Sequence, residues 1–359
     1  MAINIQNHSK FLASTIIDTF VEDKPVAAGL SGFFPRVTTP TIYVDLEIER
    51  DNDLIAVDVK RYTAGNKNKF SIATEKKFQP PFYQEEYDFQ RDEVYMTTIA
   101  LGAGLNNASV NQAIAQRALT NVRRMRNKIE RALRKQYAEV MMTGIVELKS
   151  GDSIDFKRKA ASLVDLGAAK YWTAGTSDPI DDFTNGGQFL RDEGSSGATV
   201  LNAIMRSPAL SALLKNTAVK TELDSRRIDR GNIGSPEFST AEGLAFHGQI
   251  SSGDYLVNLW TYNEKYTNDA GATVYYMDGN KVVLLPEDFR GRTAFAGLPD
   301  MAMREVGGVS TEMPSVTEAE FLLRAYSDTK TKSSTIELTS APLAVPVTID
   351  RIYTMQVLA

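Results

Sequence analysis

Residues 109–142 read SVNQAIAQRALTNVRRMRNKIERALRKQYAEVMM, without a single Gly or Pro. Apolar side chains recur in this segment at steps of three or four residues, which is the spacing of one helical face. They are Val110, Ile114, Ala118, Val122, Met125, Ile129, Leu133, Tyr137 and Val140. Ser109 and Gln112 form a capping box, and Gly144 stands where a helix commonly stops. The segment predicts a rod of roughly 50 Å, longer than the usual globular helix, and favours an extended subunit over a small compact domain.

The opposite face of this predicted helix is basic. Its cations are Arg117, Arg123, Arg124, Arg126, Lys128, Arg131, Arg134 and Lys135, and within the helix only Glu130 and Glu139 can pair with them. One interpretation is a stripe that binds nucleic acid. The other is a solvated face, or a seam that pairs with acidic neighbours. We favour the second, because the chain has a formal net charge of -5 and a pI near 5.4, whereas a dedicated nucleic-acid binder usually carries a basic surplus.

The composition is that of an ordinary soluble protein of two or three domains. The chain has 359 residues, of which 43% are hydrophobic and 24% charged. It has no cysteine, which excludes disulfides and thiolate chemistry and fits a cytosolic product. The N-terminal MAINIQNHSK lacks the pattern of a signal peptide. No apolar run approaches the 18 residues of a spanning helix, so no membrane partner is expected.

The first 95 residues predict segments that reach outward. Residues 1–35 form a leading arm, with a short helix near Phe11–Phe20 and then an apolar stretch rich in Gly and Pro. Residues 36–95 alternate as strands around a polar tip at 65–69, with a return strand over 70–78. Isolated hairpins are marginal in water. We therefore expect both segments to lie on another surface, either of this chain or of a neighbour.

The remainder predicts a compact α/β or α+β unit over 185–300, followed by strands to the C-terminus. A hairpin is expected over 144–156. A linker is expected over 173–185, with Pro179 at a helix start and Gly186-Gly187 after it, and a domain boundary near 185. Within the unit we expect strands at 199–205, 255–262, 274–277 and 281–285, a helix starting at Ser207-Pro208, a second at 218–227, and a polar loop at 231–243. Later strands are expected at 321–326, 335–340 and 351–358.

Catalytic chemistry has little support in the sequence. There are only two histidines, His8 and His247, and there is no nucleophile elbow, zinc cluster or phosphate-binding loop. The acidic pairs are Asp51 with Asp53 and Asp181 with Asp182. They could hold a hard cation or act as an acid–base pair, but we interpret them as turn and helix-cap residues. We expect no enzyme activity, no cofactor and no catalytic or metal site.

Three stretches carry a family resemblance. They are AVKTELDSRR at 218–227, the run from Gly248 through GDYLV at 253–257 to Tyr262, and the ending SAPL at 340–343 with QVLA at 356–359. In this combination the chain resembles the major capsid proteins of lambda-like tailed phages. Their corresponding stretches are AVK-x-x-LD-x-RR, G…GD-x-x before an apolar run and Tyr, and SAPL…VQLA. The C-terminal half carries these motifs, and the N-terminal half matches more loosely.

The resemblance implies an α+β fold of the Hong Kong 97 capsid type. It has an N-terminal arm (1–35), an extended β loop (36–95), a peripheral domain with the long spine helix (96–184 and 301–359) and an axial domain (185–300). It also implies contacts between subunits, which we expect at Phe33, Phe34, Ile42, Val44, Lys76, Lys77, Phe78, Arg226 and Arg227. Crosslinking through Lys76 or Lys77 is not expected, because lambda-like members are not generally crosslinked.

The function implied is that of the major head protein of a tailed phage or prophage. Copies would form pentamers and hexamers of an icosahedral shell in the virion, assembled in the host cytoplasm. The implied partners are a separate scaffolding protein, a portal protein, a decoration protein, and double-stranded DNA held by enclosure. Two alternatives stay open: a nucleic-acid-binding protein that uses the Arg-rich helix, and an encapsulin-like nanocompartment shell.

Overall fold

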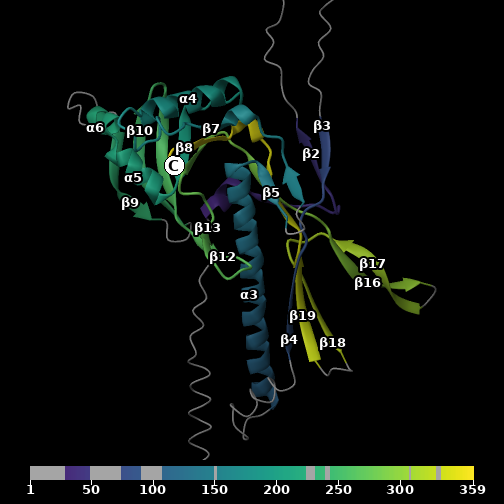
Figure 1. Cartoon of the computed structure of the whole chain (residues 1–359). Helices are drawn as coiled ribbons and strands as arrows, with labels where there is room; N and C mark the ends of the chain where they lie inside the picture. Colours follow the sequence, from purple (N-terminus) through teal and green to yellow (C-terminus); the bar gives the residue numbers. More distant parts are fainter. Residues whose placement is uncertain are drawn as a thin grey trace, which may run out of the picture.

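The computed structural model describes residues 29–48, 74–89, 107–148, 152–223, 231–238, 243–306, 309–328 and 333–359. A long helix forms the axis of the molecule (Figure 1). A compact unit of sheet and short helices lies at the upper end of this helix. A narrow sheet runs along its lower part, and two hairpins project on the side of that sheet (Figure 1). The predicted segments 1–28 and 49–73, which hold the arm helix and the polar tip, fall outside the described residues.

The long helix is α3, Asn107–Met142, as the periodicity predicts. It begins two residues before the predicted capping box, so Ser109 lies inside its first turn. Gly144 ends it in the left-handed region, with φ +75°, and donates its N–H to the Val140 carbonyl at 3.0 Å. A glycine is favoured there because it has no Cβ to clash at positive φ.

The compact unit is built on a seven-stranded mixed sheet. In spatial order its strands are β7 (Leu163–Asp165), β21 (Tyr353–Gln356), β14 (Lys281–Pro286), β8 (Val200–Met205), β11 (Tyr255–Tyr262), β10 (Leu244–Ser252) and β9 (Gly231–Phe238). Val282 to Leu285 are all fully buried, and they alternate between two hydrophobic clusters on opposite faces. A sheet covered on both faces explains this continuous apolar run.

Three helices cover one face of that sheet: α4 (Pro179–Asp192), α5 (Ser207–Lys215) and α6 (Thr217–Leu223). Gly186 and Gly187 let α4 approach closely, since an added Cβ would lie 2.5 Å from Leu284 and 2.6 Å from Tyr255. The linker expected over 173–185 is therefore wrong in its second half. Pro179 opens a helix there because Asp178 caps it, accepting from the N–H of Ile180 at 3.0 Å.

The polar loop expected over 231–243 is also wrong over its first eight residues. They form β9, which pairs antiparallel with β10. β9 lies at the sheet edge, where a strand has one partner and tolerates Gly and Pro, as in GNIGSPEF. An edge strand can form without alternating hydrophobic and polar residues, so the sequence of β9 resembles that of a loop.

The upper half of α3 packs against the other face of the compact unit through the largest hydrophobic cluster. A three-stranded sheet lies in this cluster: β1 (Arg36–Thr38), β15 (Gly291–Phe295) and β20 (Pro342–Pro346). The predicted hairpin is confirmed as β5 (Ile145–Glu147) and β6 (Ser153–Asp155). Three short 3-10 turns complete the layer: η1 (Gly29–Phe33), η2 (Ala160–Ser162) and η3 (Ile349–Arg351).

The lower half of α3 packs on a separate antiparallel sheet of β18 (Leu322–Asp328), β19 (Ser333–Ser340) and β4 (Tyr83–Phe89). Met125 and Ile129 of the helix meet Leu338 of β19 in a third cluster, with Tyr83, Tyr87, Val122, Phe321 and Ile336 around them. We call the lower half of α3, together with the β18–β19–β4 sheet, the spine layer. β4 was expected within the extended loop, but it belongs to the spine layer.

Three further hairpins complete the part of the chain that the structure describes. They are β2 (Val44–Ile48) with β3 (Thr74–Phe78), β12 (Lys265–Thr267) with β13 (Thr273–Tyr275), and β16 (Leu298–Val306) with β17 (Val309–Thr317). The strand pattern of the sequence did not predict the β16–β17 hairpin. The seven-stranded sheet also takes β7 and β21 from outside 185–300, so it draws on both of the segments expected to form separate domains.

Candidate subunit interface

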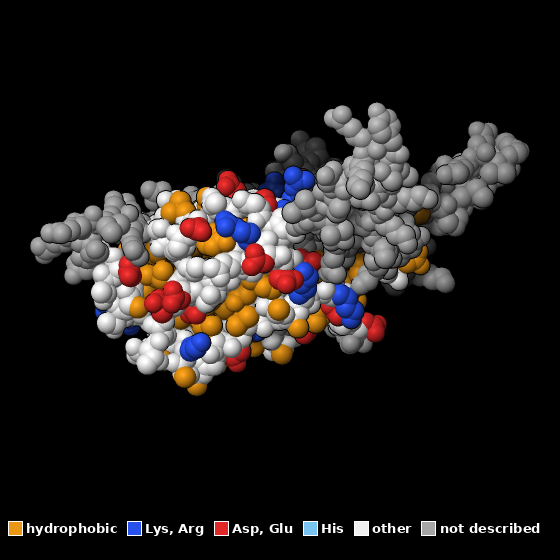
Figure 2. Space-filling view, turned by 90° about the horizontal axis from the view of Figure 1, so that it is seen from above, with side chains coloured by type: hydrophobic (Ala, Val, Ile, Leu, Met, Phe, Trp, Pro, Cys, Tyr) orange, Lys and Arg blue, Asp and Glu red, His pale blue; other side chains and the backbone are white. Residues whose placement is uncertain are grey.

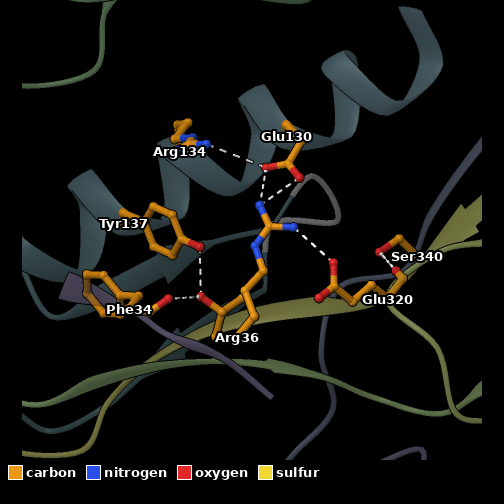
Figure 3. Close-up of polar contacts among 8 residues, drawn as sticks. Phe34, Arg36, Glu130, Arg134, Tyr137, Glu320 and Ser340 are labelled. Atoms are coloured by element: carbon orange, nitrogen blue, oxygen red, sulfur yellow. Dashed lines mark hydrogen bonds and ion pairs between the residues drawn. The ribbon is translucent and has the colours of Figure 1, made fainter. Parts of the chain in front are cut away.

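Arg36 fixes the point at which the chain leaves the core toward the β2–β3 hairpin. Its guanidinium donates hydrogen bonds to both carboxylate oxygens of Glu130 in α3, at 2.7 and 2.8 Å. It also donates to the carboxylate of Glu320 at 3.0 Å (Figure 3). Arg134 lies one turn on, 3.6 Å from the same Glu130 carboxylate. Burial alone would lower the pKa of Arg36, but its bonds to Glu130 and Glu320 outweigh this and raise it. The arginine is thus a permanent cation between the spine and β1.

A second contact lies beside the first and is buried. The Tyr137 and Thr293 hydroxyls are 2.7 Å apart, and the Thr293 hydroxyl donates to the carbonyl of Phe34 at 3.0 Å (Figure 3). The rings of Phe34 and Tyr137 stack with centroids 4.7 Å apart. Burial raises the pKa of the Tyr137 hydroxyl, so it stays protonated and able to donate. The chain on either side of Arg36 is therefore held to one face of α3.

The base of the β2–β3 hairpin is held equally firmly. Thr39 donates its N–H to Phe295 at 2.8 Å, and Gly297 donates to Thr41 at 2.8 Å. Val44 is 1% exposed, and the Phe78 ring lies 5.3 Å from Phe156. Beyond this anchored base, β2 and β3 point away from the core beside the compact unit (Figure 1). The hairpin therefore starts from a fixed position and direction.

Arg158 joins the upper end of α3 to the compact unit. It donates to the carbonyls of Met141, Ser162 and Ile352 at 2.9, 3.1 and 2.9 Å, and to the hydroxyls of Ser162 and Thr354 at 2.7 and 2.9 Å. Burial lowers the pKa of its guanidinium. Met141 is near the end of the helix, where carbonyls lack intrahelical partners. Arg158 thus satisfies the helix end while binding the last strand of the sheet.

The structure places the residues predicted to contact other subunits in three different settings. Phe34 and Val44 are buried inside this chain and Phe33 packs on the same cluster, so these three side chains contribute to the core of the subunit itself. Ile42 is 45% exposed, and Phe78 is partly buried against the core. Lys76 and Lys77 lie in β3, opposite Leu46 and Asp45 of β2. Arg226 and Arg227 lie outside the described residues.

The predicted acidic pair at the start of α4 has a structural place. Asp182 accepts a hydrogen bond from the Trp172 indole N–H at 2.9 Å, and burial raises its pKa to about 6. Asp181 is exposed in the first turn of the helix, where negative charge is favourable. Among the described residues, no group of three His, Asp or Glu side chains could hold a metal ion. Viewed from above, charged groups are scattered among hydrophobic patches on the compact unit (Figure 2).

The sequence did not identify Arg36, Glu130 or Arg158 as a group. Arg36 and Glu130 are 94 positions apart, and Arg158 sits in a Lys-Arg-Lys run that resembles an ordinary solvated surface. Gly144 offered one signal, because a glycine after a long helix indicates a stop that something must pack against.

The arrangement of a long spine, a compact unit and anchored projecting hairpins can be compared with known proteins. The family model of phage major capsid protein E matches residues 22–357. The chain belongs to this family. No curated protein matches it. The crystal structure of the proposed capsid protein of a prophage from E. coli CFT073 is similar in fold, with TM-score 0.57, 18% identity and 100% of both chains covered.

Two structures of assembled capsids are similar to this chain more weakly. The native GTA particle capsid has TM-score 0.49 and 11% identity, covering 95% of this chain and 94% of that chain. The mature capsid of bacteriophage PhiM1 has TM-score 0.46 and 11% identity, covering 93% and 88%.

The expected family and the Hong Kong 97-type fold are confirmed. As a member of this family, the chain is a phage major capsid protein, a structural protein of the virion. Among the described helices, none is both long and apolar enough to cross a bilayer. The family match assigns the basic face of α3 to a capsid subunit.

Proposed function

We propose that this capsid protein assembles as pentamers and hexamers of an icosahedral head that encloses double-stranded DNA, and that the β2–β3 hairpin lies on the adjacent subunit. The anchored base of the hairpin is the observation that supports this. Ile42 and Tyr43, at the start of the hairpin, are 45% and 51% exposed. Apolar side chains held outward at a fixed angle suit a complementary neighbour.

The proposal extends to partners and place. Assembly occurs in the host cytoplasm with a separate scaffolding protein and a portal protein, and a decoration protein binds the finished shell. The DNA is held by enclosure, without sequence-specific contacts. A formal net charge of -5 supports this, because an acidic wall does not adhere strongly to a packed polyanion. The division into arm, extended loop, peripheral and axial parts is also part of this proposal, with β4 assigned to the peripheral part and β7 and β21 to the sheet of the axial part.

The test is to shorten the hairpin while leaving its base intact. Deleting 52–79 would also remove β3 and Phe78, which packs on Phe156. The cleaner variant removes 52–72 and joins β2 to β3 with a short turn. A matched variant replaces 52–72 by Gly and Ser at equal length. We expect both to fold with unchanged circular dichroism, and neither to give closed shells in negative-stain microscopy.

Normal shells from the deletion variant would contradict the role of the hairpin. Shells from the Gly/Ser variant alone would show that the reach of the segment matters and its side chains do not. Wild-type protein that forms no shell, ring or sheet, even beside a scaffolding partner, would contradict the assembly proposal itself.

A further inference from the structure

Two neighbouring arginines on the spine have no ionic partner among the residues that the structure describes. Most other cations of α3 are engaged: Lys128 with Glu85 at 2.7 Å, Lys135 with Glu139 at 3.0 Å, Arg134 with Glu130, and Arg126 over the Phe321 ring at 5.0 Å. Arg123 and Arg124 are exposed, and no ion pair forms at either one within the described part of the chain. At 100° per residue they face away from the sheet that Val122, Met125 and Ile129 contact.

The sheet of the spine layer carries the opposite charge on its outer face. Glu86 of β4 stands directly opposite Glu337 of β19, and Asp88 lies two residues further along the same face. These positions alternate with Tyr87, Ile336 and Leu338, which face α3. Like charges directly opposite each other on a sheet are destabilising. The subunit therefore holds an unfavourable carboxylate pair on an accessible surface.

A cation is close to this carboxylate pair, but it binds elsewhere. Arg324 of β18 is the other neighbour of Glu337 in the register. Its guanidinium instead bonds to Asp300 and to the Pro299 carbonyl, at the base of the β16–β17 hairpin. Glu86 accepts a hydrogen bond from the Gln84 amide, at 2.6 Å. Within the described residues, no cation pairs with Glu86 or Glu337.

The two surfaces lie on opposite sides of one layer, helix on one side and sheet on the other (Figure 1). We infer that Arg123 and Arg124 of one copy pair with Glu86 and Glu337 of the next copy around a capsomer. This inference rests on the proposed ring assembly. The contact is heterologous, because different patches meet, and such contacts close into rings when the rotation permits. A second copy is the fitting occupant because one chain supplies both complementary patches.

The pairing acts mainly on register and specificity. Exposed ion pairs contribute little individually, but complementary patches align partners and disfavour wrong orientations. Each ring repeats the contact once per copy, so a small defect per contact is multiplied. Salt should weaken it, since the Debye length is about 8 Å at physiological ionic strength and about 3 Å at 1 M.

Charge reversal on each side, alone and combined, tests the inference. The basic-side variant is R123E/R124E, the acidic-side variant is E86K/E337K, and the third carries all four changes. We expect shell yield at physiological salt to fall about tenfold or more in each double variant, equivalent to about 1.4 kcal/mol, and to recover in the quadruple variant. The losses should shrink in roughly 1 M salt. The control K215E/K220E makes the same charge change at exposed lysines of α5 and α6 and should form shells.

The outcomes separate this inference from the assembly proposal. Wild-type shells with no recovery in a folded quadruple variant would overturn the pairing and leave the assembly proposal standing. Normal shells from R123E/R124E that package less DNA would also overturn it, and would assign the arginines to nucleic acid. Circular dichroism and thermal unfolding of each variant distinguish lost pairing from lost folding.

Discussion

Two sets of charged side chains, one in or beside the compact unit and one in the lower spine layer, have opposite surroundings. In the compact unit and its junction with α3, Arg158 and Asp182 are largely removed from water and bonded to neutral groups of the same chain. In the lower spine layer, Arg123, Arg124 and Glu86 are exposed and have no ionic partner among the described residues. On α3 itself, Glu130 and Arg134 are buried and paired, whereas Arg123 and Arg124, two turns earlier in the helix, are exposed.

The difference separates folding from assembly. A buried charge is costly unless its hydrogen bonds are made, so charges in the compact unit are committed to the fold of the subunit. Exposed charges contribute little to folding and remain available to a neighbour. Substitutions near Arg158 should therefore change the free energy of unfolding, whereas substitutions near Arg123 should change shell formation.

The largest effect on the free energy of unfolding is expected from Arg158→Met. The change leaves the carbonyls of Met141 and Ile352 and the Thr354 hydroxyl without this donor inside the protein. We expect a loss of about 3 kcal/mol in the free energy of unfolding, because several buried acceptors lose a charged donor, and relief of the desolvated guanidinium offsets part of that loss. Urea unfolding of the unassembled subunit, followed by circular dichroism, measures it.

The neighbouring lysine provides the matched control. Lys157 is exposed and pairs only with Asp155, at 2.6 Å. Lys157→Met should therefore change the free energy of unfolding by no more than about 1 kcal/mol. Similar losses from both variants would mean that the Arg158 network adds nothing beyond an ordinary surface pair.

A smaller effect is expected at the end of the helix, from Gly144→Ala. Gly144 has φ +75°, and an added Cβ would lie 2.9 Å from the Arg158 Cβ. Gly167 is the control, because its φ of +76° is nearly the same but nothing lies within 4 Å of an added Cβ. Ala at either position should cost about 1 kcal/mol for its backbone. Gly144→Ala should lose about 1–2 kcal/mol more, because the contact forces Arg158 to shift.

Equal unfolding free energies for the two alanine variants would contradict a packed junction. That result would mean that the chain near Arg158 moves to accept the added Cβ at no cost in free energy. The evidence that this junction stabilises the fold would then rest on the Arg158 hydrogen bonds alone.

Strongly periodic elements could be predicted from the sequence. The 3.6-residue pattern predicts α3, and the alternation over 255–262 predicts β11 with its observed bounds. Elements whose pattern is weakened by their position could not. β9 is an edge strand with one partner, and α4 begins with polar residues that resemble a linker.

The candidate interface was predictable only in part. The basic face of α3 is visible in the sequence, but the engaged and free cations cannot be distinguished there. That distinction depends on strands far along the chain: Glu85 pairs with Lys128 across 43 positions. Glu86 and Glu337 lie opposite each other because of the register between β4 and β19. The hydrophobic pattern of one strand does not fix that register when its partner strand is unknown.

The smallest expected effect returns to the compact unit, where pH tests the buried charge directly. Burial raises the pKa of Asp182 to about 6, above its usual value of 3.8. Between roughly pH 4 and 6 the folded state therefore binds more protons than the unfolded state, so stability falls as pH rises through this window. Asp182→Asn removes the charge and keeps an acceptor for the Trp172 indole. We expect a gain of about 1 kcal/mol at pH 7.5, reduced by partial solvation of the carboxylate.

The same variant should gain nothing at pH 4, where the wild-type carboxyl is already largely neutral, and thermal unfolding at the two pH values measures the difference. Asp181→Asn is the control, because this carboxylate is exposed and favourably placed at the helix start. It should lose a few tenths of a kcal/mol at pH 7.5. A gain at Asp182 that persists unchanged at pH 4 would show that shape, and not desolvation of charge, limits stability there. Stability of the compact unit would then not depend on the charge of Asp182, and only the salt dependence of shell formation through the spine layer would remain of the contrast.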